Sequence, residues 1–301
     1  MKIYVQEVGM RDGLQIENRF VPTDKKIDLI NRLSETGLDK IEVTSFVSPT
    51  AVPNLKDAEE VMAGIQRNPS ITYTALVPNM KGAERALACN VDEVNLVVSV
   101  SESHNQKNVR ASVEESFKRF QQITRFLTGS KTSINGTLGT SFGCPYEGEI
   151  SEDRVLRLVE RYLEMGVSGI TLADTTGMAT PNQVHRLCQK VLGKWPNLSL
   201  TLHFHNTRGM GLANVIEGIR AGVARYDASL GGIGGCPFAP GATGNICTED
   251  FVHMLVFMGY DLGVDVDGLI TCSEYLQSLI GHDVPGQVIK AGKITDLHPV
   301  S

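Results

Sequence analysis

Short apolar runs rich in β-branched residues recur along the chain, and longer stretches with an apolar period near 3.6 residues separate them. The short runs predict strands and the longer stretches predict helices. The strand candidates are residues 3–8, 40–46, 71–77, 93–99, 132–142, 169–174, 199–205 and 226–230. Eight strands that alternate with helices favour an α/β fold of the (β/α)8 TIM-barrel type.

Residues with special backbone preferences predict where several helices begin and end. Thr23 is expected to cap a helix over 24–35, and Gly37 is expected to end it. Further helices are expected over 151–165, 182–192 and 210–221, with Pro181 in the first turn of the second and Gly166 and Gly222 after the other two.

The domain organisation follows from length and from the lack of any boundary signal. A chain of 301 residues could form two ordinary domains or one large barrel. We find no linker, low-complexity tract or block of charge that would mark a domain boundary. No GxGxxG follows the first strand, which argues against a doubly wound sheet. We therefore expect one barrel domain over 1–301, with a helical extension from about residue 248.

Composition narrows the class of protein. The hydrophobic content of 42% and the charged content of 21% are those of a globular protein, and a net charge of −6 gives no basic surface for nucleic acid. No apolar run approaches membrane-spanning length, and Met1 leads into a strand rather than a signal peptide. The 6 cysteines show no CxxC spacing. We expect a cytoplasmic enzyme.

The candidate chemistry begins with His203 and His205. Two histidines two apart on a strand direct both imidazoles to one face, and imidazole is the commonest metal ligand. Mg²⁺ or Mn²⁺ would need an oxygen ligand as well, and Asp12 follows the first strand. All parallel barrel strands end at one face, so these residues are expected to meet there. Two core histidines and an aspartate that shapes the turn before Gly13 remain the alternative.

Three more polar residues are expected at the same face. Arg11 precedes Asp12, Glu42 lies on the second strand, and Asp174 ends the sixth. Each also has an ordinary explanation. Arg11 could form a salt bridge to Glu42, and Asp174 could cap the next helix.

Several segments around these residues resemble the 3-hydroxy-3-methylglutaryl-CoA lyase family, one of the metal-dependent TIM-barrel lyases and synthases. The segments are EVGMRDGLQ at 7–15, IEVTSFVSP at 41–49, GCPYEG at 143–148, HFH at 203–205 and GGCPFAPG at 234–241. The resemblance runs in register from about residue 3 to residue 260, and TGNICTED at 243–250 is typical of the lyase branch.

The resemblance implies a metal site, a set of catalytic residues and an acyl-CoA substrate. It implies Mg²⁺ or Mn²⁺ held by Asp12, His203, His205 and Asn245. It also implies catalytic roles for Arg11 against enolate charge, Glu42 in orienting Arg11 or the metal ligands, Asp174 beside the substrate hydroxyl, His203, and Cys236 as a proton donor or acceptor on a glycine-rich lid. The substrate would contact Gln15, Asn135, Thr137, Thr175 and Lys107. A buried, inert thiol is the alternative for Cys236.

The implied reaction is cleavage of 3-hydroxy-3-methylglutaryl-CoA to acetyl-CoA and acetoacetate, a step of leucine degradation and ketone body metabolism, and a homodimer is compatible with it. Strand five departs from the family, because Asn135-Gly136-Thr137 stands where the lyase branch typically has Arg-Gly-Tyr. A lyase for a citramalyl-type or longer 3-hydroxyglutaryl-CoA is therefore one alternative. A condensing synthase is another, and a non-catalytic metal-binding barrel is the alternative from a different class.

Overall fold

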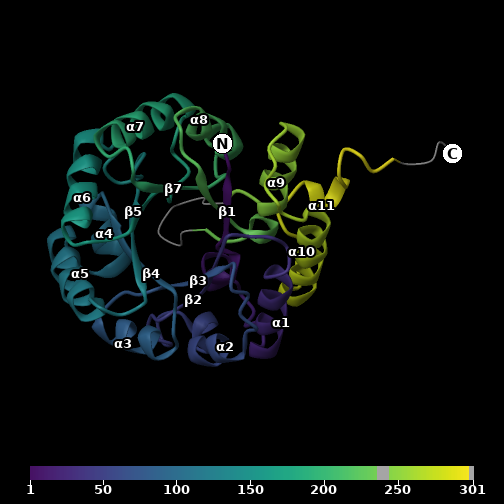
Figure 1. The fold of residues 1–301 in the computed structure, drawn as a ribbon, viewed down its shortest axis with the longest axis horizontal. Helices are drawn as coiled ribbons and strands as arrows, with labels where there is room; N and C mark the ends of the chain where they lie inside the picture. The colour runs from purple at the N-terminus through teal and green to yellow at the C-terminus, as the bar shows by residue number, and fades with distance from the viewer. Residues whose placement is uncertain (236–243, 298–301) are drawn as a thin grey trace.

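Eight parallel strands close into a barrel in the computed structural model, which describes residues 1–235 and 244–297 (Figure 1). The strands are β1 (Tyr4–Glu7), β2 (Lys40–Ser45), β3 (Thr72–Leu76), β4 (Glu93–Ser99), β5 (Ser133–Gly139), β6 (Gly169–Asp174), β7 (Ser199–Phe204) and β8 (Arg225–Ala228). Each strand pairs in parallel with the next, and β8 pairs with β1. The predicted TIM barrel is confirmed, and every strand candidate contributes one strand.

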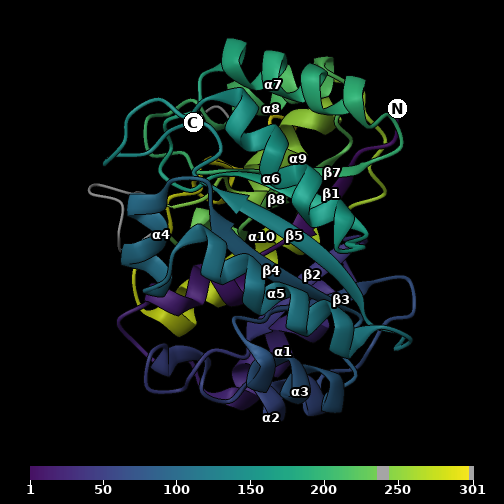
Figure 2. The ribbon, with the colours of Figure 1, turned by 90° about the vertical axis from the view of Figure 1, so that its left-hand side faces the viewer.

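A ring of helices surrounds the barrel. It comprises α1 (Thr23–Leu33), α2 (Ala58–Gly64), α3 (Met80–Ala88), α4 (Glu102–Val109), α5 (Val113–Leu127), α6 (Glu152–Glu164), α7 (Pro181–Lys194) and α8 (Gly211–Arg220). Figure 2 shows α5 and α6 lying across β4 and β5. The described residues also form one short π-helix, η1 (Gly9–Gly13), and three short 3-10 helices, η2 (Leu14–Ile16), η3 (Pro53–Leu55) and η4 (Leu230–Gly232).

Three helices follow β8, as the sequence predicts: α9 (Thr248–Phe257), α10 (Val266–Ile280) and α11 (Val288–Ala291). In Figure 1 they lie beside α1 and β1 on one side of the barrel, and α10 packs on α1. That residues 1–301 form a single domain stays a prediction. Within the described ranges, no helix is long and apolar enough to cross a membrane.

Some element boundaries differ from those expected. Strand β5 ends at Gly139 instead of residue 142, because Thr140 has a φ of 55° and leaves the extended conformation. The capping role expected of Thr23 is wrong. Thr23 is the first residue of α1, and its hydroxyl donates to the Asp57 carboxylate at 2.8 Å rather than capping the helix. Gly37 does end this region in the left-handed conformation, with a φ of 84°.

A buried carboxylate, Glu7, ties the end of β1 to the elements that follow β8. Its Oε1 accepts hydrogen bonds from the backbone N–H groups of Gly9 at 2.6 Å and Leu230 at 2.9 Å, and its Oε2 accepts one from the Thr248 hydroxyl at 2.6 Å. Burial raises the pKa of Glu7 to about 7, although these donors oppose the shift. Glu7 therefore holds the start of η1, the start of η4 and the start of α9 together.

Because the folded state binds the Glu7 proton more tightly than the unfolded chain, this group favours folding below pH 4.5, and that contribution is lost as the pH rises to about 7. Glu7→Gln keeps one acceptor oxygen and cannot ionise. The free energy of unfolding of Glu7→Gln minus that of the natural protein is expected to rise by roughly 2–3 kcal/mol between pH 5 and pH 8. Urea unfolding of both proteins measures it, and a pH-independent difference would contradict it.

Candidate active site

Arg11 is held at the carboxyl end of β1 by two carboxylates. After Glu7 the chain turns into η1, which brings Arg11 towards β2. The Nε of Arg11 donates to Glu42 Oε2 at 2.6 Å, and its Nη1 contacts Asp12 Oδ1 at 2.5 Å. Burial alone would lower the pKa of Arg11, but the charges of Glu42 and Asp12 outweigh burial and raise it. The salt bridge is thus present, and it keeps a guanidinium charged in a largely buried place.

Asp12, His203 and His205 form a buried group that could hold a metal ion. One potential ligand atom of each residue lies within 4.8 Å of the others. Strand β7 carries His203 near its end and His205 follows it, so both imidazoles face the same side, as expected. Their Nε2 atoms lie 3.2 Å apart, and Nδ1 of His203 lies 3.2 Å from Asp227 Oδ2.

The chemistry of this group fits a divalent cation. Burial and the neighbouring His203 lower the pKa of His205 to about 4, so its imidazole is neutral at ordinary pH, the form that can bind a metal ion. Burial opposes ionisation of Asp12, but Arg11 and His203 lower its pKa to about 2. The buried Nδ1 of His205 has no hydrogen-bond partner among the described residues. The Nε2 atom of His205 lies 3.2 Å from His203 Nε2 and 4.0 Å from Asp12 Oδ2, so a cation between them would meet two imidazole nitrogens and a carboxylate oxygen.

Asn245 lies beside this group because residues 244 and 245 pair with the chain just after β7. His205 and Asn245 form an antiparallel bridge, and Asn206 N donates to Gly244 O at 2.9 Å. The Nδ2 of Asn245 donates to Asp12 Oδ2 at 2.8 Å, while its buried Oδ1 has no partner within the described ranges. An unsatisfied amide oxygen next to Asp12 suits the expected role in metal binding, which stays a prediction.

Asp174 ends β6, and its two carboxylate oxygens have different surroundings. Its Oδ1 accepts from the backbone N–H groups of Met178 at 2.7 Å and Ala179 at 3.1 Å, so it does order the segment before α7. The Oδ2 atom is buried without a partner in the part of the chain that the structure describes. Burial raises the pKa of Asp174 to about 7, which suits a group that exchanges a proton near neutral pH.

Comparison with known proteins decides the family. The HMGL-like family model matches residues 2–276. The chain belongs to the HMGL-like family. It is 41% identical to the hydroxymethylglutaryl-CoA lyase YngG of Bacillus subtilis, over 97% of this chain and 98% of that protein. It is also 39% identical to the cytoplasmic 3-hydroxy-3-methylglutaryl-CoA lyase of Rattus norvegicus, over 96% of this chain and 84% of that protein.

A solved structure shows the same similarity. An HMG-CoA lyase from Acinetobacter baumannii, in complex with coenzyme A and 3-methylmalate, superposes with a TM-score of 0.97 at 56% identity. The alignment covers 100% of this chain and 98% of that one. The fold of the described residues of this HMGL-like chain is therefore that of a solved HMG-CoA lyase.

The residues expected to bind substrate lie at different depths in the HMGL-like barrel. Gln15 is half-buried on η2, and Thr175 follows Asp174 and accepts from Thr140 N at 3.2 Å. Thr137 is half-buried on β5, two residues nearer the mouth than the buried Asn135. Lys107 is exposed on α4 and lies 4.1 Å from the ring centroid of Tyr146. The remaining candidate, Cys236, lies outside the described residues.

Sequence reasoning missed two polar residues that contact this site. Asp227 on β8 bonds His203, and Asn95 on β4 donates to Glu42 Oε1 at 2.9 Å. Asn95 stands within the largely apolar run of β4, where an amide side chain is unusual, whereas β8 also carries Arg225 and gives no such contrast for Asp227. That contrast was the available signal for Asn95. Asp227 lies where it can fix the tautomer of His203, as carboxylates do for metal-binding histidines.

Proposed function

We propose that this chain is a carbon–carbon lyase that cleaves 3-hydroxy-3-methylglutaryl-CoA to acetyl-CoA and acetoacetate. The observation that carries the proposal is the Arg11 guanidinium. It is charged, largely buried and held directly beside the Asp12, His203 and His205 group at the mouth of an HMGL-like barrel. A non-catalytic metal-binding barrel has no need of a guanidinium held in that place. The identity of the relatives supports the same assignment.

The reaction needs negative charge to be stabilised twice. A proton leaves the hydroxyl on C3, the bond between C2 and C3 breaks, C3 becomes a ketone, and the electron pair forms the enolate of acetyl-CoA. A proton then adds to C2. Asp12, His203, His205 and Asn245 would hold Mg²⁺ or Mn²⁺, which when bound supplies a Lewis acid for the oxygens that carry charge.

We assign the remaining roles to this chain's own side chains. Asp174, whose Oδ2 has no partner among residues 1–235 and 244–297, would accept the proton of the substrate hydroxyl. Arg11, oriented by Glu42, would stabilise the enolate oxygen, and Asp227 would orient His203. Cys236 would supply the proton that C2 receives. Gln15, Thr137, Thr175 and Lys107 are the proposed substrate contacts.

Within this function, the alternative concerns which 3-hydroxyacyl-CoA is the substrate. The Acinetobacter baumannii relative was solved with coenzyme A and 3-methylmalate, a hydroxydicarboxylate. Together with the strand-five departure at Thr137, this favours a related 3-hydroxyacyl-CoA as the alternative substrate. Cleavage of 3-hydroxy-3-methylglutaryl-CoA would place the chain in leucine degradation and ketone body metabolism. We also propose a cytoplasmic location, on the likeness to the cytoplasmic rat enzyme, and a homodimer that sedimentation would test.

The function is tested with purified protein, Mg²⁺ or Mn²⁺, and a panel of 3-hydroxyacyl-CoAs. Release of acetyl-CoA from 3-hydroxy-3-methylglutaryl-CoA is the expected result, and it should stop when a chelator removes the metal. Release from a citramalyl-type compound alone would favour the alternative lyase. Failure with every compound, together with condensation of acetyl-CoA and a keto acid, would favour a synthase.

Thr137→Tyr tests the substrate pocket. A bulky ring in place of a small side chain near the barrel mouth narrows the space beside β5. The ratio of kcat/KM between 3-hydroxy-3-methylglutaryl-CoA and a longer acyl-CoA is expected to change by about ten- to two-hundred-fold, the usual range for a steric difference in a pocket. The panel measures the ratio, and an unchanged ratio would remove Thr137 from the determinants of specificity.

A further inference from the structure

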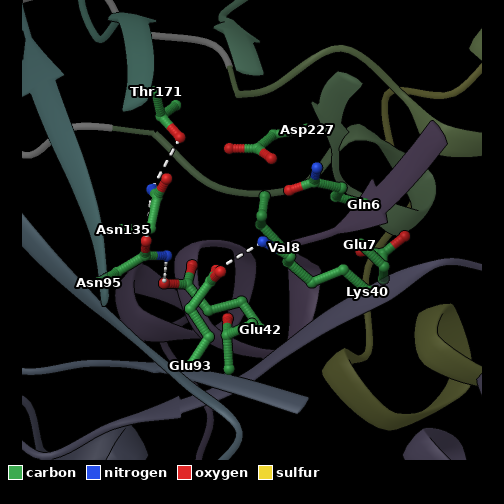
Figure 3. Close-up of a pocket in the computed structure, with 11 residues that line it drawn as sticks. Gln6, Glu7, Val8, Lys40, Glu42, Glu93, Asn95, Asn135, Thr171 and Asp227 are labelled. Atoms are coloured by element: carbon green, nitrogen blue, oxygen red, sulfur yellow. Dashed lines mark hydrogen bonds and ion pairs between the residues drawn. The ribbon is translucent and has the colours of Figure 1, made fainter. Parts of the chain in front are cut away.

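The barrel interior beneath Arg11 is polar. TIM-barrel interiors are usually filled by branched apolar side chains. Here a small cavity of about 10 Å³ is bordered instead by Glu42, Asn95, Asn135 and Thr171, among other polar residues (Figure 3). Glu42, Asn135 and Thr171 are between 2% and 5% exposed. Buried polar groups are costly unless they are paired, so their contacts deserve a functional account.

These side chains form a continuous hydrogen-bonded series that leads to Arg11. Asn135 Nδ2 on β5 donates to Asn95 Oδ1 on β4 at 2.7 Å, and Asn95 Nδ2 donates to Glu42 Oε1 on β2 at 2.9 Å. The other oxygen of Glu42 accepts from Arg11 Nε at 2.6 Å. Figure 3 shows the bonds from Asn135 to Asn95 and from Asn95 to Glu42. The series therefore joins β5 to the guanidinium across two intervening side chains.

Which group of Asn95 faces Glu42 depends on the bond that Asn95 forms with Asn135. The amide of Asn95 can face Glu42 with its NH₂ group or, after rotation by about half a turn, with its carbonyl oxygen. A carbonyl oxygen against a carboxylate would be repulsive. The donor on Asn135 selects the first orientation, because it bonds the Asn95 oxygen and holds it away from Glu42.

The position of the Asn135 amide is itself constrained. Its Nδ2 also donates to Thr171 Oγ1 on β6 at 2.9 Å. On the neighbouring strand residue 169 is glycine, and a Cβ there would lie 2.9 Å from Asn135 Oδ1, closer than ordinary contact. The barrel thus leaves room for this amide and gives it fixed partners.

We infer that Asn135 is a positioning residue that acts through Asn95 to hold the Glu42 carboxylate, and with it the Arg11 guanidinium, in the orientation used in catalysis. The inference rests on the proposed function for the role of Arg11. It gives Asn135 a role other than the substrate contact that the family resemblance implies, since the amide nitrogen is engaged by Asn95 and Thr171.

The test is a double-mutant cycle. Asn135→Leu and Asn95→Leu are each expected to lower kcat by about ten- to hundred-fold, the usual effect of removing a partner that orients an active-site group. The double variant should lose no more than the larger single loss, because both act on the same carboxylate. KM and the preference among acyl-CoAs should stay unchanged, as should the affinity for Mn²⁺ measured by calorimetry.

Thr74→Val is the matched control. Thr74 borders the same cavity, and its buried hydroxyl has no partner among the described residues, so removing the hydroxyl should leave kcat within about twofold. Asn135→Asp, which keeps the size and removes the donor, replaces Asn135→Leu if the latter fails to fold. It should lower kcat in the same way.

Three outcomes would overturn the inference: losses that multiply in the double variant, a changed KM or substrate preference in the Asn135 variants, or a kcat for those variants equal to that of Thr74→Val. Each leaves the lyase assignment intact as long as the natural protein releases acetyl-CoA. If the natural protein cleaves no acyl-CoA, the proposed function itself has failed.

Discussion

Arg11→Met is expected to lower kcat on the order of 100- to 1,000-fold while leaving the fold and metal binding in place. Methionine keeps much of the length of arginine and removes the positive charge. The charge matters most when the thioester oxygen becomes an enolate, so the loss should appear in kcat rather than in KM. Steady-state kinetics measure the two constants, and calorimetry with Mn²⁺ measures the metal affinity.

The matched control is Arg186→Met, which removes a guanidinium that pairs with Glu152 on the exterior. The side chain of Arg186 is 55% exposed, and kcat should not change. Near-normal turnover of Arg11→Met would remove Arg11 from the mechanism. A parallel loss of metal affinity would mean that Arg11 serves the metal site instead of the enolate.

His205→Phe is expected to abolish metal binding and with it the activity. Phenylalanine keeps a ring in the buried position and removes both ring nitrogens, so the group loses one of its two imidazoles. A ligand that binds only the folded state raises the melting temperature. Mn²⁺ should therefore raise the Tm of the natural protein and leave the Tm of His205→Phe unchanged, which differential scanning calorimetry measures without reference to activity.

His282→Phe is the control for this change. His282 pairs with Glu17 at the surface, where its side chain is 51% exposed, so the Mn²⁺-dependent rise in Tm should persist. A similar rise in His205→Phe would show that the metal binds elsewhere. Metal content of the dialysed proteins gives an independent measure of the same difference.

Local patterns in the sequence determined the barrel and the rim of its site. The period of the apolar runs is a property of neighbouring residues, so it predicted eight strands and the helices between them. Alternation along one strand placed His203 and His205 on the same side, and the shared direction of parallel strands brought Asp12 to them. Each inference needed only the chain's own periodicity and one rule of topology.

Only the tertiary structure decided which side chains meet across strands. Asp227 pairs with His203, and Asn95 pairs with both Glu42 and Asn135, because barrel closure and strand register set those distances. The hydrogen-bond partner of a side chain can likewise lie far away in the sequence. Thr23 is already the first helical residue of α1 rather than its cap, and its hydroxyl bonds the Asp57 carboxylate, 34 residues away. The period of a sequence pattern indicates which face of a strand or helix a residue occupies. Which side chains on those faces touch depends on how the strands close into the barrel.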